Sequence, residues 1–307
     1  MVAQPLARWR AGRRAAGYSR RMPFADELLA ALGQAFAGRA APRVKALHLP
    51  PVPWTGSRDG EFGALELDSG ALGLSYLLLD DTLATIGDAA ALVRDADALD
   101  VARWWAEAAA PGGAAGRATR SALGFAAVNA LTRELFDRAG FVPPAATDSI
   151  GGLDPRPGEH IGMVGFFPPL VKQVTARGAR LTVLELRADL AGAREAFAIT
   201  LDPADLADCT QVLSTSTVLL NHTLEGVLAS CRSARHVALV GPGAGCLPDG
   251  LFARGVTLLG GSWVVDAEAF KQALATGAPW GGSARKFALT RANYPGWQAL
   301  LAVADKP

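Results

Sequence analysis

Side chains that could bind a metal ion or a small ligand gather between residues 214 and 225. Four consecutive hydroxyl residues, 214–217, are followed by an amide, an imidazole and a carboxylate. These groups supply the oxygen and nitrogen ligands that hard and borderline metal ions prefer. The predicted metal ligands in this stretch are Asn221, His222 and Glu225. The polar residues expected to line the same cleft are Ser214, Thr217, Thr223 and, from an earlier segment, Asn129.

The elements around this stretch would bring its polar groups together. A short strand, Gln211 to Ser214, is followed by apolar residues at helical spacing up to about Cys231. Asn221 and Glu225, four residues apart, would share one polar face of that helix. Open α/β sheets bind ligands where the carboxyl end of a strand meets the amino end of a helix. A hydroxyl-capped helix with a solvated polar face is the plainer alternative.

A second group of residues bears on nucleotide binding. A predicted strand that ends in Gly165 is followed by two phenylalanines and two prolines. A dinucleotide fold needs glycines at this turn, and proline has no N–H to donate to a pyrophosphate. NAD and FAD are therefore disfavoured. Glu185 ends the next strand, a position from which an acid can hold a ribose, so a nucleoside ligand such as S-adenosylmethionine stays open. A surface glutamate at a strand end is the alternative.

A glycine-rich turn at 241–245 (GPGAG) follows another predicted strand. It resembles a phosphate-binding loop but lacks the Lys-Ser/Thr ending of a P-loop. We expect it to present backbone groups to a ligand in a cleft, with ordinary turn chemistry as the alternative. The predicted cofactor-binding residues are Gly165, Glu185, Gly241, Pro242 and Gly243.

Other common motifs are missing from the sequence. The four histidines are widely separated, and there is no HExxH, CxxC or nucleophile elbow. Hydrolase chemistry therefore has no support. The three cysteines are too far apart for a zinc knuckle, and their odd number disfavours a disulfide framework. Their use is typical of a protein from a reducing cytoplasm.

The composition limits the class of partner. The chain has 307 residues, half of them apolar, with a formal charge of +1 and a pI near 7.8. Such a chain can bury a large core, and it has no basic excess that would favour nucleic acid. No apolar run approaches the roughly 20 residues that cross a bilayer. We therefore expect a soluble, cytoplasmic protein that binds a small molecule or metal chelate and no membrane, and we leave a homodimer open.

The order of predicted elements divides the chain into three parts. Residues 1–21 contain six arginines and no acid, so we expect a disordered extension, or a true start at Met22. Residues 22–144 combine strands and helices as an α+β domain. Residues 145–307 begin with a linker and then alternate short apolar strands with helices, the rhythm of a Rossmann-like parallel sheet. The predicted fold class is therefore α/β.

Strands are predicted from short apolar runs between turn residues. In the first domain they lie at 43–49 and on both sides of a turn at 68–70. In the second domain they lie at 160–166, 180–185, 211–214, 236–240 and 256–259. A helix is predicted at 121–139, where Asn129 is flanked by apolar residues. We expect its amide to be buried, and a buried amide must find hydrogen-bond partners.

Several motifs resemble a bacterial and archaeal family described as "putative heavy-metal chelation" proteins. They are MVGFFPPLV (163–171), VLEL (183–186), Asp208, STSTVLLNHTLEGVL (214–228), VGPGAGCLPDGLFARGVTLLGG (240–261) and, more weakly, AAVNAL (126–131). The resemblance implies a domain similar to the enolase amino-terminal fold, then a Rossmann-like domain, with the active site proposed between them. Residues that match the family pattern by position are Asn129, Gly165, Pro168, Glu185, Thr217, Asn221, Thr223, Glu225, Gly241 and Pro242.

The chain departs from the family pattern at two places. Ser214-Thr215 stands where the family usually has Thr-Gly, and Gly243 stands where a serine-like residue often follows the Gly-Pro pair. Both departures could alter the ligand.

Three functional hypotheses follow. In the first, the protein binds a metal ion or metal chelate in an interdomain cleft, with Glu185 joining the three predicted ligands and the amides after Gly241 holding an anionic part of the chelate. In the second, an enzyme of metallophore or cofactor metabolism acts on a small metabolite, with a nucleoside cofactor held by Glu185. In the third, the chain is a non-catalytic interaction protein with an exposed apolar patch.

Overall fold

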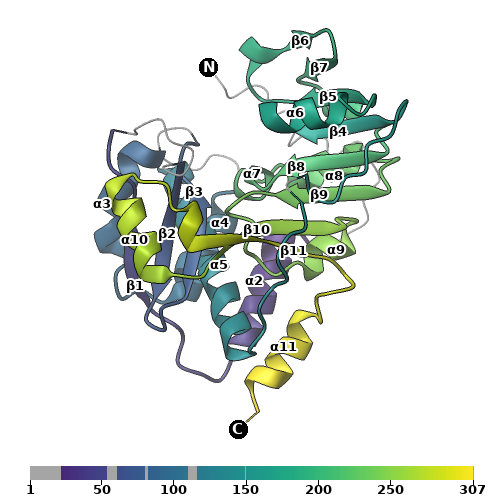
Figure 1. The fold of residues 1–307 in the computed structure, drawn as a ribbon. Helices are drawn as coiled ribbons and strands as arrows, with labels where there is room; N and C mark the ends of the chain where they lie inside the picture. Colours follow the sequence, from purple (N-terminus) through teal and green to yellow (C-terminus); the bar gives the residue numbers. More distant parts are fainter. Residues whose placement is uncertain (1–21, 54–60, 80–81, 110–115, 149, 307) are drawn as a thin grey trace. The chain divides into compact units, whose positions relative to one another are not determined.

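The computed structural model (Figure 1) describes residues 22–53, 61–79, 82–109, 116–148 and 150–306. The predicted extension at 1–21 lies outside these residues. The described chain divides into two compact units. The parallel-sheet unit comprises residues 146–240 and 251–259. The α+β unit comprises residues 22–145, 241–250 and 260–307.

The predicted domains divide the chain once, between residues 144 and 145. The compact units divide it more often, because residues 241–250 and 260–307 group with residues 22–145. The last third of the chain therefore contributes to both units.

Eight strands form a mostly parallel sheet in the order β11-β10-β9-β8-β4-β5-β7-β6. The strands of the parallel-sheet unit are β4 (His160–Val164), β5 (Arg180–Leu184), β6 (Gly192–Ala193), β7 (Phe197–Thr200), β8 (Gln211–Thr215) and β9 (His236–Val240). All their pairings are parallel except β6 with β7. The order is completed by β10 (Leu258–Val264) and β11 (Ala284–Leu289). This sheet confirms the predicted α/β class, although β6, β7 and β11 were not predicted.

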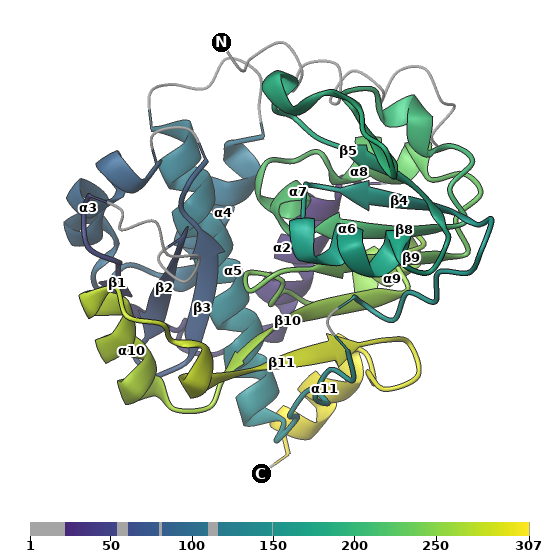
Figure 2. The ribbon, with the colours of Figure 1, turned by 45° about the horizontal axis from the view of Figure 1, so that its top comes forward.

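The strands of this unit are apolar on both faces because helices cover them. Ile161 and Met163 of β4 are fully buried, as are Val183 and Leu184 of β5, which is typical of parallel strands between two helical layers. Helix α6 (Pro168–Thr175) links β4 to β5, while α7 (Thr217–Leu220) and α8 (Leu224–Ser230) link β8 to β9. These links run in opposite directions along the sheet. Right-handed crossovers therefore place α6 and α8 on opposite faces, as Figure 2 shows.

The single helix predicted after Ser214 is wrong, because the structure breaks it into α7 and α8. Asn221 ends α7, and its Oδ1 accepts hydrogen bonds from the N–H of Thr223 at 3.2 Å and from the Thr223 hydroxyl at 2.6 Å. His222 has a φ of +58°, in the left-handed region that a continuous helix cannot contain. Asn221 and Glu225 therefore do not share a helix face.

The α+β unit contains a three-stranded antiparallel sheet in the order β1-β2-β3. Its strands are β1 (Val44–His48), β2 (Phe62–Leu67) and β3 (Leu72–Tyr76). Its helices are α2 (Phe24–Ala35), α3 (Thr82–Val93), α4 (Ala98–Glu107), α5 (Arg117–Arg138), α10 (Ala267–Thr276) and α11 (Trp297–Ala304). The predicted turn between β2 and β3 is confirmed, with Gly70 at a φ of +90° and its N–H donating to the Leu67 carbonyl. Shorter elements of the described chain are α9 (Asp249–Ala253) and the 3₁₀ turns Ala188–Leu190, Pro203–Leu206 and Gly281–Ser283.

Strand β3 and helix α5 approach so closely that only glycine fits between them. A Cβ on Gly73 would lie 2.1 Å from the Ala126 carbonyl oxygen and 2.2 Å from the Ala130 amide nitrogen. The middle of α5 is buried on nearly every side, so the predicted helix is confirmed but it is not a surface helix with one apolar stripe. Gly73 therefore sets the distance between Leu74 of β3 and Asn129 of α5.

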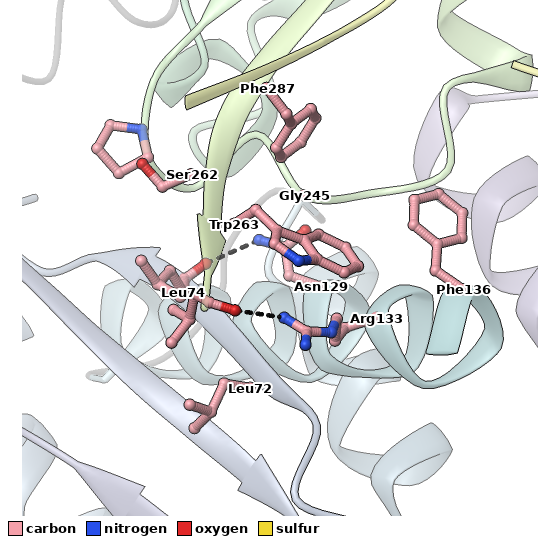
Figure 3. A pocket seen from close by; sticks show the side chains of 11 residues that line it. Leu72, Leu74, Asn129, Arg133, Phe136, Gly245, Ser262, Trp263 and Phe287 are labelled. Carbon is pink, nitrogen blue, oxygen red and sulfur yellow. Dashed lines mark hydrogen bonds between the residues drawn. The ribbon is translucent and has the colours of Figure 1, made fainter. Parts of the chain in front are cut away.

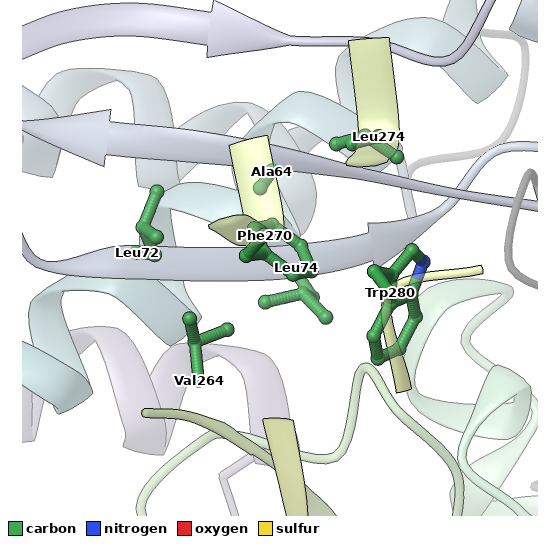
Figure 4. Packing of buried hydrophobic residues seen from close by; sticks show 7 residues of the cluster. All are labelled: Ala64, Leu72, Leu74, Val264, Phe270, Leu274 and Trp280. Atoms are coloured by element: carbon green, nitrogen blue, oxygen red, sulfur yellow. The ribbon is translucent and has the colours of Figure 1, made fainter. Parts of the chain in front are cut away.

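A cluster of apolar side chains packs α10 against the three-stranded sheet. Figure 4 shows Ala64, Leu72 and Leu74 of the sheet together with Val264, Phe270, Leu274 and Trp280. The Phe270 and Trp280 rings meet edge to face, with centroids 5.3 Å apart, a favoured geometry. Burial of each large side chain stabilises the fold by about 1.5–3 kcal/mol. Sequence segments some 200 residues apart thus share one core.

A buried carboxylate on β2 adds an ionic contact between α10 and the sheet. Glu66 accepts hydrogen bonds from Lys45 at 2.8 Å and from His48 at 2.7 Å, and Lys271 of α10 lies 3.5 Å away. Burial is the largest single influence and raises the pKa of Glu66. The hydrogen bonds and the lysine charges together outweigh it, so the pKa lies below its ordinary value. Glu66 is therefore ionised in the folded unit at neutral pH.

Within the described residues, no helix is both long enough and apolar enough to span a membrane. The longest, α5, is buried against the three-stranded sheet and α4 instead.

Candidate functional site

The parallel-sheet unit has a topological switch point between β4 and β8. From β4 the chain passes to β5 on one side, and from β8 it passes to β9 on the other. Open α/β sheets bind ligands outside the carboxyl ends of the two strands where the connections diverge. The registers Val164↔Ser214 and Val164↔Leu184 place the ends of β4, β5 and β8 at one edge. We call this edge, with residues 165–167, 185–187 and 214–225, the carboxyl edge.

Gly165 occupies the first position after β4 at this edge. Its φ of +87° is in the region that favours glycine, and its N–H donates to the Leu184 carbonyl at 2.9 Å. A Cβ there would lie only 3.2 Å from the methyl carbon of Thr215. A larger residue would therefore strain the backbone and crowd the end of β8.

Glu185 holds two loops of the carboxyl edge together. One carboxylate oxygen accepts the N–H of Phe166 at 3.0 Å, and the other accepts the N–H groups of Leu186 at 2.7 Å and Arg187 at 3.4 Å. Hydrogen bonds to an ionised acceptor are among the stronger ones in proteins. Both oxygens are thus already used by the backbone, which favours a structural role over the ribose contact considered from the sequence.

The amino end of α6 offers little to a phosphate. Pro168 and Pro169 carry no N–H, and the next two amides, of Leu170 and Val171, both donate to the Phe167 carbonyl. A pyrophosphate would need free N–H groups at this position. The residues present therefore do not fit a dinucleotide, as the sequence indicated.

The hydroxyl run lies at the switch point itself. The hydroxyls of Thr215 and Thr217 are 2.9 Å apart, and the Thr217 N–H donates to the Thr215 hydroxyl at 3.2 Å. The Ser214 hydroxyl, fully buried, donates to the Thr215 carbonyl. The Asn221 N–H donates to the Thr217 carbonyl at 3.0 Å, which joins the run to the turn that contains His222. Most of the predicted polar residues thus gather at one edge.

The predicted metal ligands do not form a coordination group of the usual size. Asn221 Oδ1 already accepts two hydrogen bonds, both from Thr223, and two donors fill the lone pairs of an amide oxygen. Among the residues that the structure describes, no three or more His, Cys, Asp or Glu side chains lie together as they would around a metal ion. Structural zinc sites usually have four protein ligands and catalytic zinc sites three. These residues therefore do not fit a bare metal ion held by the protein alone.

The cysteines do not change this conclusion. Burial raises the pKa of all three thiols to about 12; they belong to Cys209, Cys231 and Cys246. The thiolate is the form that binds metals. At neutral pH these side chains are therefore protonated and act as small apolar groups.

The opposite, amino edge of the sheet carries a different polar group. His160 at the start of β4 accepts a hydrogen bond from Arg180 at Nδ1, at 2.8 Å, and its Nε2 lies 2.8 Å from the Thr182 hydroxyl. Burial, and then the Arg180 charge, lower the pKa of His160 below its ordinary value. His160 is thus a neutral, hydrogen-bonded histidine that serves the fold.

The remaining predicted residues lie in the α+β unit, around Asn129. Its amide nitrogen donates to the Leu74 carbonyl at 2.7 Å and to the Gly243 carbonyl at 2.8 Å. The side chain is only 3% exposed, so the predicted burial is confirmed. Gly241 starts the glycine-rich turn with its N–H donating to the Gly260 carbonyl, and its carbonyl accepts from Ala244. Asn129 therefore ties this turn to β3 and α5.

A small cavity of about 30 Å³ lies beside Asn129 (Figure 3). Its polar lining comes from Asn129, Arg133 and Ser262, and Pro242 and Gly245 bring the glycine-rich turn to its wall. The rest of the lining is aliphatic or aromatic. Since one water needs roughly 10–15 Å³ of such space, the cavity has room for about two. We call it the Asn129 pocket.

Two buried oxygens near this turn lack partners among the described residues: Asn129 Oδ1 and the Ser75 hydroxyl. An unsatisfied buried polar group costs about 1–3 kcal/mol. Sequence reasoning singled out Asn129 but missed Ser75, Arg133 and the aromatic wall. Arg133 follows Asn129 by one helical turn, so the spacing could have suggested it. Ser75 carried no comparable signal.

Comparisons with known proteins agree with this fold. Residues 149–293 match the family model described as "putative heavy-metal chelation". The family recognised from the sequence motifs is thereby confirmed for this region of the chain.

Two crystal structures of proteins with unknown function, described as members of the same family, have a similar fold over most of the chain. The protein from Desulfitobacterium hafniense has a TM-score of 0.62 and 19% identity, over 87% of this chain and 99% of that chain. The protein from Pyrococcus horikoshii has a TM-score of 0.60 and 16% identity, over 87% and 99%. At such identities the likeness shows the fold alone. No curated protein matches the chain in sequence.

Proposed function

We propose that the carboxyl edge of the parallel-sheet unit binds a metal chelate, meaning a metal ion already held by a small molecule. The observation that carries this proposal is the position of Gly165, Thr215 and Thr217 on the two sides of the switch point between β4 and β8. Hydroxyls and a glycine at such a point suit a small polar ligand. The family description supplies the metal.

A chelate is favoured over a bare ion because of the ligand count. Among the described residues, no three or more His, Cys, Asp or Glu side chains are placed as they would be around a metal ion, whereas a zinc ion held by the protein alone has three or four protein ligands. A chelate carries most of its own donor atoms, so one protein ligand would suffice. His222, in the left-handed turn between α7 and α8, is the residue that we assign to this role. Glu225, three residues further along the chain in the first turn of α8, is the second candidate.

The enzyme hypothesis with a nucleoside cofactor receives less support. Glu185 would be its ribose ligand, but three backbone N–H groups already use that carboxylate. The two prolines of α6 also remove the amides that a phosphate would need. We therefore expect S-adenosylmethionine to leave the melting temperature unchanged.

The test is a binding titration of the full chain with ions and chelates in parallel. Ni²⁺ and Fe³⁺ would be compared with Ni²⁺–histidine and Fe³⁺–citrate by calorimetry and by thermal shift. We expect saturable binding of at least one chelate and none of the bare ion at the same concentration. His222→Ala should weaken chelate binding by at least tenfold, about 1.4 kcal/mol. His160→Asn, which changes a histidine at the amino edge of the same sheet, should not.

Two outcomes would contradict this proposal. Stoichiometric binding of a bare ion with unchanged affinity in His222→Ala would indicate a different metal site. Absence of binding for every ion and chelate, together with a thermal shift from S-adenosylmethionine, would favour the enzyme hypothesis.

A further inference from the structure

We propose that the Asn129 pocket of the α+β unit is a binding site for a neutral O–H donor the size of one or two water molecules, which donates to Asn129 Oδ1. This site is independent of the carboxyl edge. Its ligand would hold the glycine-rich turn in place from the inside.

The orientation of the Asn129 amide is determined by its neighbours. The two N–H bonds of the amide point to two carbonyl oxygens, of Leu74 and Gly243. A flipped amide would direct its own oxygen at both carbonyls, so only one orientation satisfies the network. Oδ1 consequently points away from β3. It is buried and has no hydrogen-bond partner within the described part of the chain.

The space beside Oδ1 is kept open by a glycine. A Cβ on Gly245 would lie 3.3 Å from Asn129 Cγ, which is tighter than ordinary contact, and 3.4 Å from Oδ1, at the limit of ordinary contact. Gly245 lines the Asn129 pocket, as Asn129 itself does. The pocket therefore has its one unsatisfied acceptor and its open volume at the same place, within the described lining.

The charges around the pocket favour a neutral ligand over a cation. Arg133 lines the pocket with its guanidinium carbon 3.8 Å from the centroid of the Trp263 ring. Its Nη1 donates to the Val264 carbonyl at 3.1 Å, and its Nε donates to both oxygens of Asp137. The described lining contains no carboxylate. A metal ion or ammonium group beside this arginine would thus have no negative partner.

The size of the pocket sets the class of ligand. About 30 Å³ accommodates roughly two waters or one hydroxyl-bearing carbon. A water molecule and the terminal hydroxyl of a small molecule share the chemistry that Oδ1 needs. The two sources differ only in whether the oxygen belongs to a larger molecule, and an experiment can separate them.

Occupancy of the site would stabilise the glycine-rich turn. Asn129 donates to Gly243 within that turn, and Gly245 and Pro242 form part of the pocket wall. A ligand on Oδ1 therefore completes the hydrogen bonding of the side chain that holds the turn. Ser75 is the next residue of β3 after Leu74, and its Cα would lie 3.8 Å from a Cβ on Gly243. Its hydroxyl also lacks a partner within the described chain.

The test uses two glycine variants of the same turn in the full chain. Gly245→Ala would fill the pocket beside Oδ1, whereas a Cβ on Gly243 would make only ordinary contacts of 3.5 and 3.8 Å outside the pocket lining. Crystal structures of the wild type and both variants would be determined at a resolution that shows ordered water. A further wild-type crystal would be soaked in ethylene glycol as the hydroxyl probe.

We expect density at about 2.6–3.2 Å from Asn129 Oδ1 in the wild type and in Gly243→Ala, and none in Gly245→Ala. The melting temperature of Gly245→Ala should fall by about 2–4 °C more than that of Gly243→Ala. A discrete peak that survives the soak supports the site with water as its ligand. A glycol oxygen in place of the peak supports it with a ligand hydroxyl.

Three results would overturn the proposal. The first is a wild-type pocket without density next to Oδ1 in a map that shows other buried waters. The second is a peak within about 2.5 Å of Oδ1 and other oxygens, since metal ions bind at such distances. The third is equal density and equal melting temperature in the two glycine variants.

Discussion

The carboxyl edge of the parallel-sheet unit and the Asn129 pocket of the α+β unit satisfy their polar groups in different ways. At the carboxyl edge, Glu185, Thr215 and Asn221 all bond to neighbouring backbone or hydroxyl groups. In the Asn129 pocket, a buried oxygen has no partner among the described residues. At the carboxyl edge Glu185 and Asn221 shape the loops, whereas the groups proposed to contact a chelate are the Thr215 and Thr217 hydroxyls and His222. The Asn129 pocket has an unmet acceptor and therefore indicates the chemistry of its ligand directly.

The missing partner of Asn129 Oδ1 follows from close backbone packing. Asn129 cannot move toward another donor, because Gly73 brings β3 against the backbone of α5 on either side of it, at Ala126 and Ala130. Because of this close backbone packing, a hydrogen-bond donor for Oδ1 has to come from a ligand.

The largest predicted effect breaks that rigid packing. Gly73→Ala places a Cβ at 2.1 and 2.2 Å from backbone atoms of α5, and backbone cannot yield as a side chain can. We expect a loss of more than about 4 kcal/mol in the free energy of unfolding, or no folded protein. Denaturant unfolding followed by circular dichroism would measure it.

A matched glycine in the other unit provides the control. In Gly162→Ala the new Cβ meets the side-chain ends of Leu206, Val212 and Cys209 at 3.0–3.2 Å. We expect a loss of about 1–2 kcal/mol, since such ends can shift. Equal losses in the two variants would show that the α+β unit is no more rigid than the parallel-sheet unit.

A smaller effect tests whether Glu185 serves the backbone. Glu185→Ala leaves the N–H groups of Phe166, Leu186 and Arg187 without their acceptor. We expect the free energy of unfolding to fall by about 2–3 kcal/mol, because hydrogen bonds to a charged group contribute about 1.5–3 kcal/mol. The control is Asp189→Ala, which removes only an exposed pair with Arg187 and should cost less than about 1 kcal/mol. A stable Glu185→Ala protein that loses ligand binding would instead make Glu185 a ligand contact.

The smallest predicted effect separates the units by pH. The pKa of His160 in the parallel-sheet unit and the pKa of Glu66 in the α+β unit both lie below their ordinary values of 6.5 and 4.5. Each folded form therefore binds protons less readily than the unfolded chain, so each contribution to stability is lost as the pH falls. The His160 contribution declines below pH 6.5, and that of Glu66 only below pH 4.5.

Melting temperatures measured from pH 7.5 down to pH 3.5 would check this order. His160→Asn should flatten the curve between pH 6.5 and the onset of acid unfolding, and Glu66→Gln should flatten it only below pH 4.5. A His160→Asn curve parallel to that of the wild type would contradict the assignment.

Much of the fold was predictable because local sequence patterns determine many of its strands and turns. The five strands of the second domain and the turn between β2 and β3 follow from apolar runs bounded by turn residues. The break between α7 and α8 was not predictable from apolar spacing, which continues through it. The break depends on a hydrogen-bonded turn of Asn221 with Thr223 and on the left-handed backbone of His222. Both are local interactions that an apolar stripe does not record.

The residues that gather in the candidate site were predictable from the sequence, but their hydrogen bonds were not. Gly165, Glu185 and the hydroxyl run do meet at one edge, because parallel strands end together. Whether a carboxylate bonds to a ligand or to a backbone amide depends on differences of a few tenths of an ångström. Such small distances cannot be predicted from the spacing of residues in the sequence. Glu185 is the clearest example, with both oxygens already bonded.

The sequence by itself determined the class of fold, the family region and the burial of Asn129, because periodicity, turn residues and motifs are properties of neighbouring residues. Only the tertiary structure decided that residues 260–307 group with the α+β unit, and that Asn129 Oδ1 faces an open pocket lined by Gly245 and Arg133. These facts depend on contacts between residues about a hundred positions apart. The physical reason is that packing depends on how well two whole surfaces fit together. Each residue contributes only a small part of that contact energy, so the packing partner cannot be predicted from single residues.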